Sequence, residues 1–600
     1  MQGPDRTHRT FHDIQDMDLK DKHQSKSNTR ILYRLLAGIL TLTWALYESF
    51  RLRWLSDDAF ISFRYAWNLV RGYGLVFNQG EYVEGFTNFL WTILISLGLS
   101  VDFPAESFSM VLSIGSLATL LILLLAGAIP WRRYRINLSN HASETEAPVN
   151  PETTTLLFYT LLILGGIHHM HVFATSGLET MSFTLSISLG TYFLWIAQKR
   201  KPGRALLFLT LACLLRPDGL IVLIIAYAYL ATVALRSIVT DKQSHNSAQG
   251  ILETNSSAGF SGGRGQYQSL VTAIRPILAT GLFLLLYQSW RLYYYDSFFP
   301  NTFYAKSAYD PYPGQGLFYL ILFYKSYWYL PLLLAVSIAL QARHSRSSSW
   351  WMLLLVVIAW HLYVIWVGGD FMFARFLIPI LPAQCALIAW ALAGWIDRFN
   401  RGQNPPENSE KALSLERTGK QGTYLGLVLP ILLLLLPAFR LDPYKILRQQ
   451  NLIPEIQGVV EERYYYPRQE MEKLGRLARS YRPLVQGTGL RLAFHGGAAF
   501  LIYNLDPDYA LEASTGLTDR TLARKILKDR GRIGHEKEAT LEYMRERNVH
   551  IYMWPPEYHR LEQTIRFEGF WQDWQIVYHE DTVIQSLLAH PSVSQPYSNP

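Results

Sequence analysis

The chain has 600 residues, of which 50% are apolar, 14% aromatic and 17% charged. That composition favours a polytopic membrane protein with a soluble part over a soluble enzyme. The net charge of +8 does not indicate a nucleic-acid partner, because the basic residues cluster in short loops between apolar segments, where the positive-inside rule accounts for them. The two cysteines, Cys213 and Cys385, lie in apolar segments and offer no disulfide or zinc spacing.

Residues 1–30 are polar and rich in Lys and His, which predicts a disordered cytoplasmic tail. The apolar segments of a membrane domain follow, over residues 31–441. A span needs about 20 apolar residues, and shorter spans are tolerated inside a bundle. Eleven stretches are predicted to cross the membrane: 31–50, 108–130, 155–174, 180–198, 204–216, 219–236, 271–290, 315–340, 349–367, 376–395 and 423–440.

The stretch at 88–102 is apolar but short, and counting it as a span would invert every later basic loop. We therefore interpret it as a re-entrant or interfacial helix within a first external loop, 51–107. A cytoplasmic N-terminus then places the loops rich in Lys and Arg on the cytoplasmic side, as the positive-inside rule requires. These loops are 131–154, 198–204, 236–270, 341–348 and 396–422.

The same topology brings the unusual polar motifs to the extracytoplasmic face. They are the segments SGLET (176–180), RPDG (216–219), PNTFYAK (300–306) and GGDFMFARF (368–376). A random distribution would have placed several of them on the other side, so their convergence predicts one polar site at this face.

Residues 442–600 lose the long apolar runs and are expected to form a small extracytoplasmic α/β domain. Strands are predicted at 490–494, 509–512 and 550–553, and helices near 517–529 and 537–547. The chain has no internal repeat of the kind that many transporters show.

Two adjacent carboxylates, Asp57 and Asp58, follow the first span directly. Acids at that depth lose solvation and repel each other, so the pair indicates a general base at the membrane–water interface. Such a base can meet a lipid-borne substrate from one side and a water-soluble substrate from the other. A pair of residues that merely caps a helix is the structural alternative.

The segment 57–91, followed in order by the four motifs above, resembles the GT-C glycosyltransferases that use polyprenyl-phosphate sugars, and most of all the terminal arabinofuranosyltransferase family of the actinobacterial cell wall. The resemblance covers most of residues 31–395 and extends more weakly through GLTD (516–519) and GHEK (534–537). It implies an α-helical GT-C membrane domain.

In that family an acidic residue of the first external loop is the base, which implies Asp58 first and Asp57 second. The other acid would orient the base, contact the acceptor or hold a divalent cation, and Mg²⁺ or Mn²⁺ stays open as a cofactor. The leaving polyprenyl phosphate gains negative charge and needs fixed cations. The candidates are Arg375, Arg216, Lys306 and Arg64, each of which could instead be a membrane-interface anchor.

Seven further residues are candidates for binding the sugar or the acceptor. Glu84 could also serve as a second carboxylate, and the acids at the span ends could simply pair with the arginines. These candidates are Glu84, Asn88, Glu179, Asp218, Asn301, Tyr304 and Asp370.

The sequence thus predicts a multi-pass glycosyltransferase of the cytoplasmic (inner) membrane. It would move a sugar, for which arabinofuranose is the expectation, from a polyprenyl-phosphate donor to an envelope glycan or glycoconjugate. A protein or lipid A glycosyltransferase of the same class is one alternative. A transporter or flippase for a lipid-linked sugar is another, although its polar residues should lie at the bilayer midplane. A non-catalytic scaffold is a third.

Overall fold

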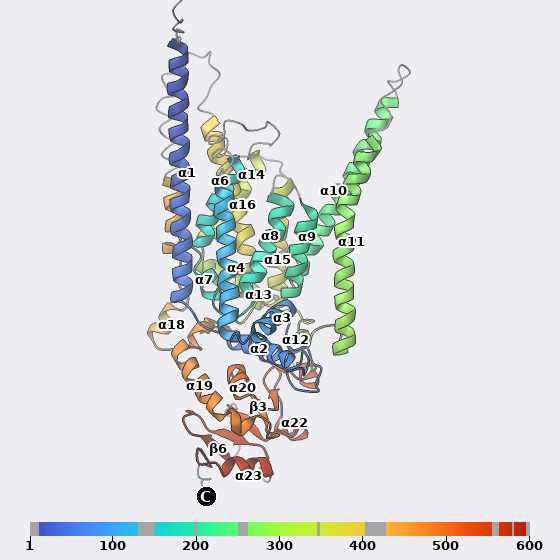
Figure 1. Cartoon of the computed structure of the whole chain (residues 1–600), viewed down its shortest axis with the longest axis vertical. Coiled ribbons are helices and arrows are strands. Elements are labelled where there is room, and N and C mark those ends of the chain that lie inside the picture. The colour runs from blue at the N-terminus through green and yellow to red at the C-terminus, as the bar shows by residue number, and fades with distance from the viewer. Residues whose placement is uncertain are drawn as a thin grey trace, which may run out of the picture.

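The computed structural model describes residues 11–129, 151–196, 201–249, 262–344, 348–401, 428–527, 529–554, 563–578 and 581–595. Long helices run side by side in one part of the molecule, and the C-terminal residues form a smaller part at one end of these helices (Figure 1). The predicted loops around 131–150, 250–261 and 402–422 lie outside the described residues.

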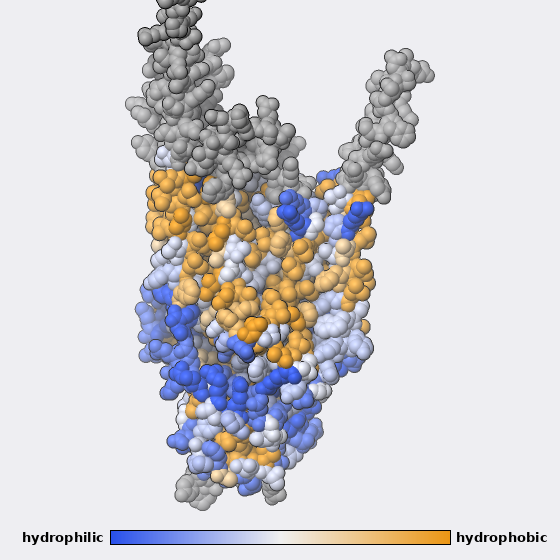
Figure 2. Space-filling view, in the orientation of Figure 1, coloured by the Kyte–Doolittle hydropathy of each residue, from blue (hydrophilic) through white to orange (hydrophobic). Residues whose placement is uncertain are grey.

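Most of the helices are apolar, as the sequence predicts. The described α-helices of the first part, apart from the short ones given below, are α1 (Phe11–Arg51), α4 (Ala105–Ala128), α6 (Pro151–Gly165), α7 (His168–Phe173), α8 (Thr180–Thr191) with a π-helical turn at Tyr192–Ile196, α9 (Pro202–Leu215), α10 (Gly219–Gln249), α11 (Gly262–Tyr295), α13 (Pro313–Ser326), α14 (Tyr329–His344), α15 (Ser348–Val367) and α16 (Leu381–Arg401). Their visible surface is largely apolar, and it becomes hydrophilic where the helices meet the C-terminal part (Figure 2).

Within the described residues, six helices are long and apolar enough to cross a membrane, and a seventh span results if one bent pair counts as a single span. Shorter apolar helices occupy Phe89–Leu99, Thr153–Gly165, Thr180–Ile196, Pro202–Leu215 and Val428–Phe439. The chain is therefore a multi-pass membrane protein, while the count of eleven spans stays a prediction.

Two predicted segments differ from the structure. The span expected at 315–340 is divided into α13 and α14, which meet at 93°. Pro331 lies in the first turn of α14, where a missing backbone N–H is tolerated, whereas in the middle of one long helix it would remove a hydrogen bond and favour a kink or break. Helix α1 begins at Phe11, inside the predicted disordered tail, because residues 11–37 contain neither Gly nor Pro to interrupt it.

Helix α2 (Asp57–Val70) and helix α3 (Phe89–Leu99) belong to the predicted first external loop. Both lie at the end of the long helices that faces the C-terminal part (Figure 1). Helix α3 has only 11 residues, too few to span a bilayer. A short helix, α12 (Asn301–Ala305), lies at the same end.

The C-terminal part, residues 442–595, is built on a six-stranded sheet with the order β4-β3-β5-β7-β6-β8. Its first three strands pair in parallel and the remaining pairs are antiparallel. The predicted strands are confirmed as β3 (Arg491–Phe494), β4 (Tyr509–Glu512) and β5 (Ile551–Met553). The remaining elements are the hairpin β1 (Glu455–Ile456) and β2 (Val459–Val460), β6 (Thr564–Phe567), β7 (Trp574–Ile576), β8 (Val593–Ser594), α18 (Lys445–Gln449), α19 (Arg468–Val485), α20 (Ala499–Leu505) and α23 (Thr582–Leu588).

The two helices predicted in this part are shorter than expected. Helix α21 covers only Arg520–Ala523, and beyond it Ile526 is 91% exposed, so the segment lacks the apolar face that would pack a longer helix. Helix α22 covers Leu541–Glu546. It begins after Thr540, whose side chain accepts a hydrogen bond from the N–H group of Tyr543, and the residues before it instead donate from Lys537 and Ala539 to carbonyls of residues 514 and 513.

Backbone hydrogen bonds and packed aromatic rings join the C-terminal part to the rest of the chain. The backbone of Val460 pairs with Phe371 and Phe373 in the loop before α16. Phe60 of α2 packs against Phe500 and Tyr503 of α20, with ring centroids 6.2 and 5.6 Å apart. One hydrophobic core therefore runs through this junction and holds the two parts together.

Candidate active site

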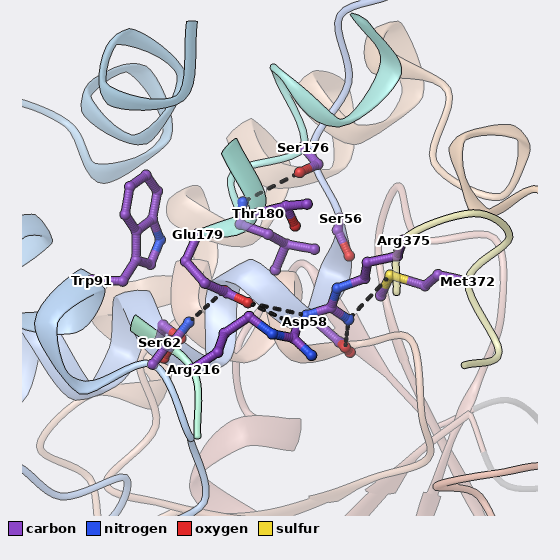
Figure 3. A network of polar contacts seen from close by, with 12 residues as sticks. Ser56, Asp58, Ser62, Trp91, Ser176, Glu179, Thr180, Arg216, Met372 and Arg375 are labelled. Atoms are coloured by element: carbon purple, nitrogen blue, oxygen red, sulfur yellow. Dashed lines mark hydrogen bonds and ion pairs between the residues drawn. The ribbon is translucent and has the colours of Figure 1, made fainter. Parts of the chain in front are cut away.

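Asp58 lies in the first turn of α2 and points toward Arg375 (Figure 3). The carboxylate oxygen is 3.7 Å from the guanidinium of Arg375. The helix begins at Asp57 after Ser56, and acids in a first turn are stabilised by the free N–H groups of the helix. The side chain of Asp58 is 31% exposed, so a substrate can reach it.

Arg375 forms ion pairs with carboxylates from three separate segments. Besides Asp58 of α2, its guanidinium lies 3.5 Å from Glu179 at the start of α8 and 3.6 Å from Asp370 in its own loop. Arg375 is only 8% exposed, and these acids compensate its buried charge. Three motifs that are far apart in the sequence thus meet at one side chain, as the topology predicts.

A second arginine extends this group of charges. Arg216 lies 3.2 Å from Glu179 and 2.8 Å from Asp218, and its guanidinium stacks on the ring of Phe376. Asn88 donates to the other oxygen of Glu179 at 2.9 Å. We call Asp58, Glu179, Arg216, Asp218, Asp370 and Arg375 the Arg375 cluster.

The environment acts differently on the acids of this cluster. Burial alone would raise the pKa of Glu179, but Arg375 and Arg216 on either side hold the pKa below its ordinary value. The pKa of Asp58 is raised, mainly by burial, although Lys306 and Arg375 oppose that rise. Glu179 is thus a permanent anion that fixes two arginines, whereas Asp58 can take up a proton.

Asp57 has a different role from Asp58. Its two carboxylate oxygens accept hydrogen bonds from the backbone N–H groups of Ala499 and Phe500, at 3.1 and 2.9 Å. The side chain is only 5% exposed. Because successive helical residues point about 100° apart, the two acids of the pair face different partners. Asp57 therefore ties α2 to the start of α20.

This attachment should depend on pH. Burial raises the pKa of Asp57 to about 7, from about 4 in an unfolded chain. A raised folded-state pKa gives stability that is full below about pH 4 and is lost as the pH rises to about 7, by up to about 1.4 kcal/mol per pH unit. We expect thermal unfolding of the purified protein to show this decline, and Asp57→Asn to flatten it. Asp102→Asn, in an exposed loop, should leave the wild-type decline intact, and a decline as steep in Asp57→Asn as in wild type would contradict the assignment.

The other two predicted cations are placed differently. Lys306 follows α12, and its ammonium lies close enough to lower the pKa of Asp58. Among the described residues, this ammonium forms no hydrogen bond or ion pair that would occupy it. Arg64 instead donates to the carbonyls of Phe77 and Pro507 and lies 3.7 Å from Asp506, so it supports the junction.

Three predicted sugar contacts are engaged in structural interactions outside the cluster. Glu84 is hydrogen-bonded by the guanidinium of Arg291 in α11. Asn301 donates to carbonyls of residues 516, 517 and 519, which anchors α12 to the C-terminal part. Tyr304 lies under the guanidinium of Arg524, at 4.8 Å from the ring centroid.

The structure adds an acid that the sequence does not single out. Glu462 lies in a 3₁₀ turn (Glu462–Tyr464) of the C-terminal part and is only 7% exposed. Its Oε1 accepts a hydrogen bond from Ser56, two residues before Asp58, at 3.0 Å. The run Glu461-Glu462-Arg463 has the pattern of an exposed charged segment, so no local signal identifies it.

The donor set fits arginine-paired carboxylates better than a metal. Within the described ranges, no group of three or more His, Cys, Asp or Glu side chains could hold a metal ion. Both oxygens of Asp57 already accept backbone N–H bonds, and Asp58 faces Arg375. The two adjacent acids therefore do not converge on a common cation.

The chain is similar in sequence to two curated glycosyltransferases. No protein-family model matches the chain. Two curated relatives are both terminal β-(1→2)-arabinofuranosyltransferases. The relative from Mycobacterium tuberculosis is 28% identical over 311 residues, which cover 50% of this chain and 42% of the relative. The relative from Corynebacterium glutamicum is 27% identical over 410 residues, which cover 62% of this chain and 54% of the relative.

These relatives confirm the resemblance that the motifs indicate. The chain spans about half the length of the curated relatives that it matches. Among solved structures, the crystal structure of ArnT from Cupriavidus metallidurans bound to undecaprenyl phosphate has a TM-score of 0.42 and 14% identity, over 81% of this chain and 87% of that chain.

Proposed function

We propose that the protein is a GT-C membrane glycosyltransferase that moves a sugar from a polyprenyl-phosphate donor to an envelope glycan or glycoconjugate. The observation that carries this proposal is the partly exposed carboxylate of Asp58 beside buried Arg375, at the end of the apolar helices. A base and fixed cations at that position can serve a lipid-borne donor and a water-soluble acceptor together. The names of the two relatives support the same reaction class.

In the proposed reaction an acceptor hydroxyl attacks the anomeric carbon of the donor sugar. The new bond joins the acceptor oxygen to that carbon, and the bond from the carbon to the phosphate oxygen breaks. The hydroxyl proton passes to Asp58, and the electron pair of the broken bond leaves with the polyprenyl phosphate. The atoms and electrons of this transfer balance without a further reactant.

The cations have distinct roles in this proposal. Arg375 and Arg216 are held by acids of the cluster and give the site a fixed positive field. Lys306 is the cation free to contact the leaving phosphate directly, because its ammonium is near Asp58 and has no partner of its own in the described part of the chain. Asp370 of the cluster, and Asn88 next to the cluster, are proposed to contact sugar hydroxyls.

We propose arabinofuranose as the sugar, following the relatives, and the extracytoplasmic face of the inner membrane as the location. Asp58 belongs to α2, which lies at the end of the long helices next to the C-terminal part (Figure 1). A transporter would need its polar residues near the bilayer midplane, so this placement favours an enzyme.

The proposal is tested with the full chain in lipid nanodiscs. We expect release of polyprenyl phosphate from synthetic polyprenyl-phospho-arabinofuranose, dependent on an arabinan-type acceptor. A parallel set of polyprenyl-phosphate hexoses and pentoses decides the sugar. Turnover with another sugar alone would replace arabinofuranose, and transport of intact donor between leaflets without any transfer would refute the enzyme.

A further inference from the structure

Glu462 enters this site from the C-terminal part, unlike the acids of the Arg375 cluster. It follows Val460 by two residues, and Val460 is bonded through its backbone to the loop that carries Asp370 and Arg375. Ser56, the residue before α2, donates to its Oε1 at 3.0 Å. Glu462 is therefore held from two sides at a fixed place beside the Arg375 cluster.

Among the described residues, Glu462 lacks the arginine partner that the acids of the Arg375 cluster have. Oε2 is buried and has no hydrogen-bond partner among the described residues. Asp58, Glu179, Asp218 and Asp370 each have an arginine nitrogen within 4 Å, whereas the described part of the chain provides no such ion pair for Glu462. A buried carboxylate without a counter-ion is costly, and protonation removes that cost.

The charges that face Glu462 also favour its protonated form. Asp58 of α2 and Asp370 of the loop before α16 are like charges, and Arg375 opposes them. On its own segment, Arg463 stacks on Tyr464, at 5.3 Å from the ring centroid, and Tyr466 lies near both Glu462 and Asp57. Burial raises the pKa of Glu462 well above its ordinary value, and Asp58 raises it further.

We propose that Glu462 is a positioning residue that carries a proton at neutral pH beside ionised Asp58, and so keeps Asp58 available as the base. This inference rests on the proposed function. Two carboxyl groups in one poorly solvated site do not both ionise, and the arginine contacts decide which of them does. At alkaline pH, loss of the Glu462 proton adds an uncompensated negative charge, which repels an anionic donor.

The test compares pH profiles of kcat/KM for the full chain in nanodiscs. Wild type should lose activity about tenfold per pH unit above the alkaline pKa, as a single essential proton requires. Glu462→Gln keeps a hydrogen-bond acceptor for Ser56 and cannot ionise, so its alkaline limb should move up by at least about one pH unit. Ser56→Ala should also move the limb upward, by less, because it removes a donor that favours the ionised form.

An infrared measurement decides the protonation state without any turnover. Wild type at neutral pH should show a protonated carboxylic acid carbonyl band that is missing from Glu462→Gln. Absence of that band, or an unchanged alkaline limb together with a roughly 100-fold loss for Glu462→Gln at about pH 7, would overturn the inference. If wild type has the band but transfers no sugar, the proposed function fails while the protonation of Glu462 stands.

Discussion

Replacing Asp58 by asparagine is expected to lower kcat about 10³-fold, because the amide cannot take the proton of the acceptor hydroxyl. The folded structure should survive, since an asparagine side chain fits the same partly exposed position and the cluster keeps Glu179 and Asp370 as counter-ions for Arg375. The measurement is release of polyprenyl phosphate by the purified variant, with thermal unfolding recorded on the same sample.

Asp102→Asn provides the matched control for this variant. Asp102 lies in the same first loop, is exposed, and has a backbone φ of 59°, which asparagine adopts readily. Its turnover should equal that of wild type. Near-normal turnover by the Asp58 variant would remove Asp58 from the role of base.

Arg375→Gln is expected to have the larger effect on folding. Three acids would lose their shared cation in a buried site, and breaking such a contact costs about 3–5 kcal/mol. Sugar transfer should fall as well, because the fixed positive field at the leaving phosphate loses one of its two arginines. Thermal unfolding in detergent and donor turnover measure the two effects separately.

Arg440→Gln tests whether removing any arginine near this face has the same result. Arg440 lies 4.0 Å from Asp442, with both side chains about 20% exposed, and a pair of that kind contributes at most about 1 kcal/mol. An Arg375 variant as stable and active as the Arg440 variant would show that the acids of the cluster do not depend on Arg375.

The Arg375 cluster could be predicted because it depends on topology. Each of its members adjoins the end of an apolar segment, and the positive-inside rule fixes which ends share a face. Asp58, Glu179 and Arg375 therefore met as expected. The strands at 491–494 and 509–512 could also be predicted, because a buried strand appears in the sequence as a short apolar run.

The partners supplied by the C-terminal part could not be predicted. The two backbone donors to Asp57, the carbonyls that hold Asn301 and the hydrogen bond from Ser56 to Glu462 link positions more than 200 residues apart. No sequence spacing predicts a contact between such distant positions. A backbone N–H donor is present in nearly every residue, so the residue type does not reveal which one is used. The bend between α13 and α14 was missed for another reason. A hydropathy pattern shows how long an apolar stretch is, but it does not show whether the helix axis changes direction within that stretch.

The continuous core at the junction has a practical consequence for making this protein. Residues 442–600 look like an independent soluble domain, yet cutting the chain at 441 would expose the rings of Phe500 and Tyr503 and leave the amides of Ala499 and Phe500 without acceptors. Exposed aromatic surface of that kind promotes aggregation. The C-terminal part should therefore be purified with its helices, as one cooperative unit.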